Sequence, residues 1–466
     1  MLTRPLSRRT LLRQTACGFG SLGLMGLLNG ETLDPLAPKT PHFAPRAKRV
    51  VFLFMHGGPS AIDTFDPKPR LDRDDGKPLP FDRPMVFGNG KEMGNLMKSP
   101  WKFKRYGQSG IEVSDLFPHI GSCIDDICVM RSMVGDSVAH GGAMLQLHTG
   151  SHVFTRPSMG SWLLYGLGSD NHDLPGYIGI RPSMTHGGVR NWSSAFLPAA
   201  YQGTAIGNSK VPVKELQIPI ENLVRNGMPT EIQRYELDMV QKINRQHAMT
   251  REFDSELDAR IQALELAFRM QAKAPEAFDI EKESPATKKL YGLDNPETAD
   301  FGWQCVLARR LLERGVRFVE CWHSNSQWDQ HRELVRLHTK NAREVDLPIA
   351  GLLKDLKARG LLQDTLVLWG GEFGRTPLVQ GGDGRDHNPY GYTMWMAGAG
   401  VKAGTTYGAT DEFGYHAVED RMHLHDLHAT ILHMMGFDHK KLTYRYSGRD
   451  FRLTDVAGEV AHKILA

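Results

Sequence analysis

The stretch Val50-Val51-Phe52-Leu53-Phe54-Met55, followed directly by His56-Gly57-Gly58-Pro59, decides the fold of this chain. A short run of β-branched and aromatic residues, closed by Gly and Pro, is typical of a parallel-sheet strand buried on both faces. The same design recurs at 316–322 and 365–369, and 392–397 is a further candidate strand. Helical patterns precede two of these strands, near residues 303–314 and 346–359. This alternation predicts an α/β fold, a three-layer sandwich with a mostly parallel central sheet flanked by helices.

The composition excludes several classes of protein. The chain has 466 residues, of which 41% are hydrophobic and 23% charged, as expected for a globular protein. The net charge of 56 − 53 = +3 is too small for a nucleic-acid-binding face. No apolar run reaches the roughly eighteen residues of a membrane span. The 20 histidines are unusual and indicate metal or acid–base chemistry.

The N-terminus predicts export. Ser7-Arg8-Arg9-Thr10-Leu11-Leu12-Arg13 is a twin-arginine pattern, and an apolar, Gly-rich stretch follows it. We therefore expect a signal peptide over 1–30, recognised by the twin-arginine export machinery, and a periplasmic or extracellular protein. A Pro-rich linker over 31–47 and one domain over 48–466 would follow. The match of Gly18-x-Gly20-x-x-Gly23 to a dinucleotide-binding fingerprint follows no strand and is discarded.

A helical insertion is predicted over 228–273. Thr230 and Gln233 form a capping-box pattern, and Ile232, Tyr235 and Met239 then fall on one helical face. One long helix or a helical hairpin would form a cap over the sheet.

Residues of the types that bind metal ions follow each predicted strand. In open α/β sheets, ligands bind beyond the carboxyl ends of the strands. Carboxylate oxygens and imidazole nitrogens are ligands that divalent ions prefer, and no single loop can surround such an ion. The candidates are Asp63 after the first strand, Asp329 and His331 after 316–322, Glu372, Asp386 and His387 after 365–369, and His416 after 392–397.

The spacing of these residues adds detail. Asp329-x-His331 can place both side chains on one side of a strand or turn. The adjacent Asp386 and His387 point to opposite sides of an extended loop, which suits two metals, or one ligand and one supporting residue. Gly384 would give the backbone room, and Arg375 would be a charged donor for an anionic substrate.

Signatures of rival chemistries are missing from the sequence. There is no Gly-x-Ser-x-Gly elbow, no Walker loop and no His-Glu-x-x-His motif. Cys123 and Cys128 have no matching second pair, so a zinc ribbon is not expected.

Three blocks of sequence carry a family resemblance: 54–67, 371–387 and 408–430. The chain resembles an exported bacterial family of unknown function within the alkaline phosphatase and arylsulfatase superfamily. The resemblance implies an alkaline-phosphatase-like fold and one or two divalent metal ions (Zn, Ca or Mn). It implies that Asp329, His331 and His416 bind one metal, and that Asp386, His387 and Asp63 bind the other. Glu372 stands where the superfamily often places an Asp.

The chain also departs from that superfamily. The position of the nucleophile, ten residues before Gly150, is occupied by His140. A histidine can attack phosphorus or act as a base, but it cannot become the formylglycine of sulfatases. Ser137 and Ser158 are weaker candidates for the nucleophile.

Together these observations predict an exported, metal-dependent hydrolase of phosphate or sulfate esters, with His140 and Arg375 as catalytic residues. The substrate would be a small anionic ester or a sulfated or phosphorylated glycan. One alternative is a non-catalytic protein of the same fold that binds a surface glycan or a partner protein. Another is a metal-dependent mutase or transferase.

Overall fold

The computed structural model describes residues 34–82, 93–212, 215, 227–249 and 255–466. The predicted signal peptide therefore lies outside the described residues. In the described part of the linker, backbone hydrogen bonds run from Lys39 to Leu167 and from Arg46 to Met434. None of the helices in the described ranges combines the length and the apolar character needed to cross a bilayer.

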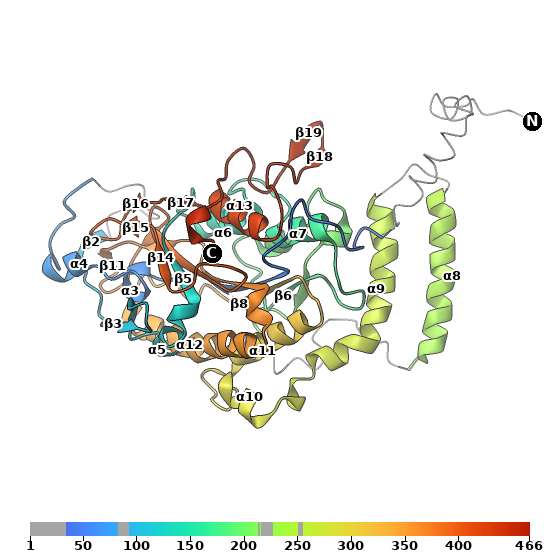
Figure 1. Cartoon of the computed structure of the whole chain (residues 1–466), viewed down its shortest axis with the longest axis horizontal. Helices are drawn as coiled ribbons and strands as arrows, with labels where there is room; N and C mark the ends of the chain where they lie inside the picture. Colours follow the sequence, from blue (N-terminus) through green and yellow to red (C-terminus); the bar gives the residue numbers. More distant parts are fainter. Residues whose placement is uncertain (1–33, 83–92, 213–214, 216–226, 250–254) are drawn as a thin grey trace, which may run out of the picture.

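A single large sheet forms the centre of the molecule (Figure 1). The strand order is β14-β5-β13-β9-β1-β8-β6-β7, and β17 pairs with β5. The strands are β1 (Arg49–Met55), β5 (Ile127–Val134), β6 (Tyr177–Ile180), β7 (Thr204–Ile206), β8 (Phe318–His323), β9 (Thr365–Gly370), β13 (Tyr392–Ala397), β14 (Thr405–Tyr407) and β17 (Met422–His423).

The sheet is mostly parallel, as predicted. β1 pairs in parallel with β8 and β9, so the strand quoted first in the sequence lies at the centre of the sheet. β13 is the exception, because it is antiparallel to both of its neighbours, β5 and β9. The start of β13, and not its end, therefore lies at the edge where the parallel strands end.

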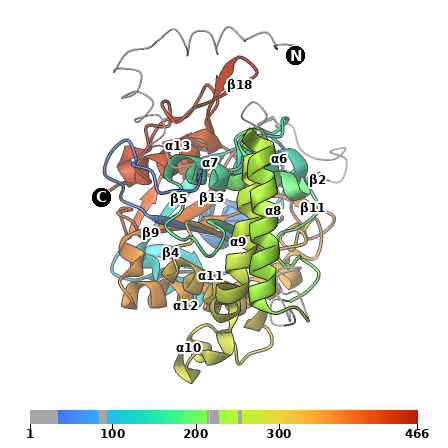
Figure 2. The same cartoon turned by 90° about the vertical axis from the view of Figure 1, so that its right-hand side faces the viewer.

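Helices cover both faces of the sheet, which confirms the three-layer α/β sandwich. In Figures 1 and 2, α11 and α12 lie on one side of the sheet, and α6, α7 and α13 lie on the other. The helices are α3 (Ala61–Thr64), α4 (Pro69–Arg73), α5 (Pro118–Gly121), α6 (His140–Thr149), α7 (Met159–Leu167), α8 (Thr230–Met249), α9 (Ser255–Phe278), α10 (Pro285–Leu290), α11 (Ala299–Glu313), α12 (Leu334–Ala358) and α13 (Leu424–Met434).

The side chains of β1 alternate between the two cores. Val51 and Leu53 pack into the core beneath α11 and α12, whereas Phe52 and Phe54 pack into the core beneath α6, α7 and α13. Successive side chains of a strand point to opposite faces, so a continuous apolar strand serves both layers.

The predicted helical insertion is a hairpin of α8 and α9, and α9 extends to Phe278. Both views show the two helices side by side at one end of the molecule (Figures 1 and 2). α9 contacts α11 and the short helix η3 (Ala199–Tyr201) beside the edge of the sheet.

Small two-stranded sheets complete the fold. The pairs are β2 (Met93–Leu96) with β11 (Leu378–Gln380), β3 (Phe103–Tyr106) with β4 (Ile111–Ser114), β10 (Gly374–Arg375) with β12 (His387–Asn388), β15 (Ala409–Thr410) with β16 (Ala417–Glu419), and β18 (Tyr444–Tyr446) with β19 (Arg449–Phe451). The four cysteines at 123, 128, 305 and 321 are buried and free.

Candidate metal centre

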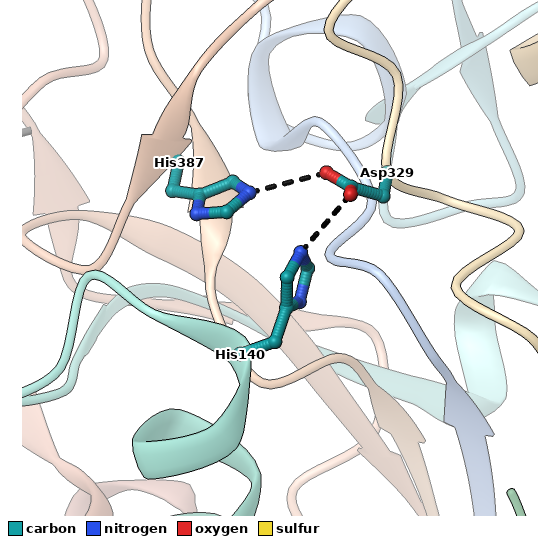
Figure 3. A group of neighbouring side chains, drawn as sticks. All are labelled: His140, Asp329 and His387. Atoms are coloured by element: carbon teal, nitrogen blue, oxygen red, sulfur yellow. Dashed lines mark hydrogen bonds and ion pairs between the residues drawn. The ribbon is translucent and has the colours of Figure 1, made fainter. Parts of the chain in front are cut away.

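Polar side chains from several strand ends meet at one edge of the sheet. Asp329 and His331 lie in the loop after β8, and His140 begins α6, the helix after β5. His387 lies just before β13, whose antiparallel direction brings its start to this same edge. Two groups of side chains could each hold a metal ion: His140 with Asp329 and His387, and His331 with Asp386 and His387. Figure 3 shows the first group.

Three side chains of this centre bring their polar atoms close together. Nε2 of His387 lies 3.1 Å from Oδ1 of Asp329 and 3.0 Å from Nε2 of His331. Nε2 of His331 lies 3.0 Å from the same Asp329 oxygen. Donor atoms about 2.0–2.1 Å from one tetrahedral ion lie roughly 3.3–3.4 Å from one another, so this spacing is close to that of a ligand set.

The outer hydrogen bonds of the two imidazoles show which atoms carry protons. Nδ1 of His387 lies 2.7 Å from the carbonyl oxygen of Val138, to which only an N–H can donate. Nδ1 of His331 likewise contacts the amide oxygen of Gln380. A neutral ring held in this way has its lone pair on Nε2, and the Nε2 atoms of both histidines face the Asp329 carboxylate. Such outer-shell bonds are the usual way of orienting metal-binding histidines.

The charges of the centre agree with this arrangement. Burial lowers the pKa of His387 to about 3, so the ring is neutral at physiological pH. Burial opposes ionisation of Asp329, but the adjacent His140 imidazole and the charge of the Arg375 guanidinium outweigh burial and hold its pKa well below the ordinary value. An ionised carboxylate facing neutral imidazole nitrogens calls for a cation.

Asp386 adds a second indication of a metal. Its Oδ1 accepts the His387 backbone N–H at 2.8 Å, whereas its Oδ2 is buried and has no hydrogen-bond partner. A buried carboxylate oxygen without a partner costs free energy, and a metal ion would remove that cost. The residues at this edge thus fit a divalent ion.

His140 forms a dyad with Glu372. Nδ1 of His140 lies 2.6 Å from Oε1 of Glu372, and its Nε2 lies 3.2 Å from Oδ2 of Asp329. Burial opposes the charge on His140, but the two carboxylates outweigh burial and raise its pKa to about 8. Glu372 is fully buried and also accepts the Gly57 backbone N–H at 3.0 and 3.1 Å. Glu372, expected to be a metal ligand, is in neither of the two groups and instead orients His140.

Two glycines allow the loops to meet. Gly57 has φ of +117°, and a Cβ there would lie 2.5 Å from the Asp329 backbone nitrogen. A Cβ on Gly384 would lie 2.0 Å from the His331 carbonyl carbon. Both contacts are with backbone, which cannot move aside as a side chain can. The close approach of the loops that carry the candidate ligands therefore depends on glycine at both positions.

Arg375 differs from its predicted role as an anion-binding donor. Its guanidinium is fully buried and donates to the carbonyls of Gly58 (3.0 Å), Arg385 (3.2 Å) and Gly57, and to Oδ1 of Asp329 (2.7 Å). Because these bonds use every guanidinium nitrogen, Arg375 positions the Asp329 carboxylate and ties the loops together.

Asp63 and His416 lie in neither of the two groups. Asp63 is fully buried and pairs with Arg385, at 2.7 Å from Nε to Oδ2 and 3.2 Å from Nη2 to Oδ1. The ring of His416 contacts the rings of Tyr390 and Tyr415. Asp63 is held by the Arg385 guanidinium. The expectation for His416 rested on the family resemblance and on a strand end at 397, and the antiparallel direction of β13 removes the second of these reasons.

The two serines considered as nucleophiles form hydrogen bonds with the backbone. Ser158 caps α7 by accepting from Ser161 N, and Ser137 Oγ lies 3.0 Å from the Ala139 carbonyl oxygen.

The roles of His186 and His56 were not predicted from the sequence. The ring of His186 stacks on that of His140 at 4.9 Å, and its backbone has a φ of 50°, which is uncommon for a residue with a side chain. The Ser326 N–H donates to Nδ1 of His56 at 3.1 Å, so the Nε2–H of neutral His56 donates to Nδ1 of His186, 3.1 Å away. His186 therefore carries its own proton on Nε2. Its loop follows β6, a four-residue strand too short to recognise in the sequence.

Solved structures similar to this chain include enzymes that act on phosphate and sulfate groups. Alkaline phosphatase from the Antarctic bacterium TAB5 is 9% identical, with 79% of this chain and 95% of that chain covered and a TM-score of 0.31. The lipoteichoic acid synthase LtaP from Listeria monocytogenes is 9% identical, with 90% and 78% covered and a TM-score of 0.37. The PsFucS1 sulfatase from Pseudoalteromonas sp. is 13% identical, with 94% and 73% covered and a TM-score of 0.35.

These scores are too low to transfer residue roles, so the chemistry of the site rests on the geometry of this chain. No curated protein sequence matches the chain. A family model does match it over residues 47–465, which is nearly the whole described part. The chain belongs to the family described as "Protein of unknown function (DUF1501)".

Proposed function

We propose that the protein is an exported, metal-dependent hydrolase of phosphate or sulfate esters. The observation that carries the proposal is the convergence of two imidazole lone pairs and one carboxylate oxygen, from Asp329, His331 and His387, within 3.0–3.1 Å of one another. The partnerless Oδ2 of Asp386 supports it. Two nitrogen ligands favour zinc over calcium, which prefers oxygen.

The bound ion would act as a Lewis acid on an oxygen of the phosphoryl or sulfuryl group. The remaining roles in the reaction belong to side chains of the protein. His140 holds its Nδ1–H against Glu372, so the ring presents a lone pair on Nε2 to the centre once it has lost its second proton. That nitrogen acts either as the nucleophile or as the base that takes the proton from water. Arg375 keeps the Asp329 carboxylate in place.

We assign to His186 the role of contacting the leaving group of the ester. Its proton sits on Nε2, because its Nδ1 accepts from His56. Burial lowers the pKa of His186, so the ring stays neutral and offers its Nε2–H as a hydrogen-bond donor. The exposed imidazole of His186, stacked on His140, would donate this hydrogen bond to the departing oxygen of an ester.

A substrate screen tests the proposal. The purified protein is loaded with Zn²⁺ or Mn²⁺ and assayed with aryl phosphates, phosphodiesters and aryl sulfates, alongside His140→Ala as the control. Metal-dependent turnover of one class that His140→Ala loses supports a hydrolase. Metal binding without turnover, together with binding of a sulfated or phosphorylated glycan, would instead support the non-catalytic alternative.

Export is a separate part of the proposal and has its own test. It rests on the pair Arg8 and Arg9 before the apolar stretch. Replacing both with Lys should keep the protein in the cytoplasm of a host that has twin-arginine export, whereas the unaltered chain reaches the periplasm. Equal periplasmic amounts would remove the twin-arginine route.

A further inference from the structure

One buried histidine lies against the loop that carries Asp329 and His331, but it is in neither group of candidate ligands. His338 lies near the start of α12, and its side chain is fully buried. Its ring meets the ring of Trp328 edge to face, with centroids 4.9 Å apart, and Trp328 directly precedes Asp329. A buried polar side chain needs hydrogen-bond partners, and the partners of His338 indicate its role.

Both ring nitrogens of His338 are bonded, and each bond reaches a different loop. Nε2 accepts the Ser60 backbone N–H at 3.1 Å, in the loop after β1. Nδ1 lies 2.6 Å from Oε1 of Gln330, the residue between Asp329 and His331. One buried ring therefore connects the loop after β1 to the loop that supplies two of the candidate ligands.

The proton of His338 can be placed from both ends. Because the Ser60 N–H is a donor, Nε2 carries the lone pair and the proton is on Nδ1. The amide of Gln330 agrees, because its nitrogen donates to the Gln327 carbonyl and its oxygen is turned toward His338. Burial lowers the pKa of His338 to about 3, so the ring stays neutral at physiological pH. His338 is thus an N–H donor of fixed direction.

The backbone of Gln330 is also held. Its carbonyl accepts the Arg385 N–H at 3.0 Å, and Arg385 directly precedes the candidate ligand Asp386. The bond from His338 fixes the side chain of the same residue. The segment from Asp329 to His331 is therefore held at its middle residue, and the directions of both candidate ligands depend on that residue.

The loop around this segment needs such support, because its backbone is strained. Asn325 and Ser326 before the segment 329–331 have φ angles of 66° and 53°, and Glu333 after it has a φ of 54°. Positive φ is uncommon for residues other than glycine, and it persists only where surrounding contacts impose it. The two bonds of His338 are contacts of this kind.

We propose that His338 is a positioning residue, whose Nδ1–H bond to Gln330 sets the directions of Asp329 and His331 and thereby the metal affinity of the centre. Loss of an outer-shell bond of this kind typically weakens metal binding by about 10–100-fold. The inference rests on the metal centre of the proposed function, but it does not require that the protein hydrolyses an ester.

Two substitutions at position 338 each keep one of the two bonds. The side-chain nitrogen of an asparagine stands about where Nδ1 stands, so His338→Asn can donate to Gln330 but does not reach Ser60. The side-chain oxygen of a glutamine reaches about as far as Nε2, so His338→Gln can accept from Ser60 but loses the bond to Gln330. Each variant loses one buried hydrogen bond, so their melting temperatures should fall by similar amounts. Their metal affinities should differ.

Titration of the full chain with Zn²⁺, in competition with a chromogenic chelator, measures these affinities. His338→Asn should bind nearly as tightly as the unaltered chain, and His338→Gln about 10–100-fold more weakly. His439→Gln is the matched control and should keep full affinity, because His439 is also buried and its Nδ1 lies 2.8 Å from Oγ1 of Thr454, outside the metal centre. Equal affinities of His338→Asn and His338→Gln overturn the proposal.

Gln330→Met provides a test that does not depend on the folding of the variants at position 338. It removes the acceptor of the bond and leaves the bond to Ser60, so it should weaken Zn²⁺ binding by about 10–100-fold. Combined with His338→Gln, it should weaken binding no further, because both changes remove the same bond. Unchanged affinity in Gln330→Met, or losses that add in the double variant, overturn the proposal.

The outcome for His338 can be told apart from that of the proposed function. Zn²⁺ binding that follows the predicted pattern, without turnover of any ester, rejects the hydrolase and supports the role of His338. Equal Zn²⁺ binding by all variants rejects the role of His338 and leaves the metal centre in place. A full chain that binds no Zn²⁺ overturns both.

Discussion

Nε2 of His387 lies 3.1 Å from Oδ1 of Asp329, and neither atom has a proton to share with the other. The His387 proton is on Nδ1, where it is bonded to the Val138 carbonyl, and the neighbouring His331 adds another lone pair 3.0 Å away. Two acceptors at this distance repel each other unless a cation lies near both. This relationship, more than any motif, defines the metal centre.

The dyad of His140 and Glu372 predicts a large loss of activity from a small change. His140→Ala should lower kcat by about 10²–10⁴-fold at saturating metal, because it removes the group that attacks or takes the proton. Steady-state kinetics on the best substrate of the screen measure this. Ser137→Ala is the control, since Ser137 contacts only backbone among its hydrogen bonds, and its kcat should stay unchanged. Equal losses in the two variants would rule His140 out as the catalytic group.

The pair of Asp63 and Arg385 separates a structural carboxylate from a metal ligand. Asp63→Asn should leave the bound metal unchanged but destabilise the protein by about 3–5 kcal/mol, because the buried Arg385 loses its ionised partner. Urea unfolding and metal analysis of the same sample measure both. Loss of metal from a folded Asp63→Asn protein would return Asp63 to the ligand set.

The close approach of Gly57 to the loop of Asp329 predicts that one added methyl group at Gly57 disturbs the metal centre. Gly57→Ala should cost at least about 2 kcal/mol of unfolding free energy and weaken metal binding, since its Cβ would meet the Asp329 backbone nitrogen at 2.5 Å. Thermal unfolding and metal titration measure the two effects. Gly110→Ala is the matched control: its φ is also positive, at +67°, but no atom lies within 4 Å of the new Cβ. It should lose only about 1 kcal/mol and keep its metal affinity. Identical behaviour of the two variants contradicts the close-approach explanation.

A buried ion pair beneath the centre predicts a pH dependence of stability. Nε2 of His148 on α6 lies 2.7 Å from Oε1 of Glu320 on β8, and both side chains are buried. Burial opposes the charge on His148, but Glu320 outweighs burial and raises its pKa. This stabilisation is therefore fully present below the unfolded-state pKa of about 6.5, and it is lost as pH rises through the higher folded-state pKa.

Glu320→Gln removes that dependence. The unaltered protein should lose stability between about pH 6.5 and the folded-state pKa of His148, and the variant should be less stable at low pH, by about 3–5 kcal/mol, with a flatter profile. Chemical unfolding across the pH range measures the difference. Glu281→Gln at an exposed pair with Lys288 is the control and should change little. Parallel profiles for the unaltered chain and Glu320→Gln would show that the pair is not linked to pH.

The fold was predictable because its signal is local. The strand 49–55 differs from the predicted 50–55 by one residue, and the strands 365–370 and 392–397 also lie where their apolar runs indicated. The length of α12 was not predictable in the same way, since it begins at Leu334 and contains Pro348. The direction of β13 was also hidden, because a buried strand has the same composition whether it runs parallel or antiparallel.

The residue types of the candidate site could be predicted from the sequence, but the side chains that each of them contacts could not. The sequence placed Asp329, His331, Asp386 and His387 at strand ends, and the structure brings them together. It could not show that Arg385 holds Asp63 or that Glu372 holds His140, because those pairs join residues more than two hundred positions apart. His186 was missed because its role depends on a ring contact with His140, and no sequence pattern links the two residues.

Metal content of the purified full chain is the most direct test of the metal centre. After dialysis against a weak chelator and reloading with Zn²⁺ or Mn²⁺, inductively coupled plasma mass spectrometry should find about one or two tightly bound ions per chain. Asp329→Asn and His387→Ala, folded by circular dichroism, should retain less than about a tenth of that amount. An unaltered chain without bound metal, or variants that bind as much as the unaltered chain, would contradict the metal centre and the hydrolase proposed from it.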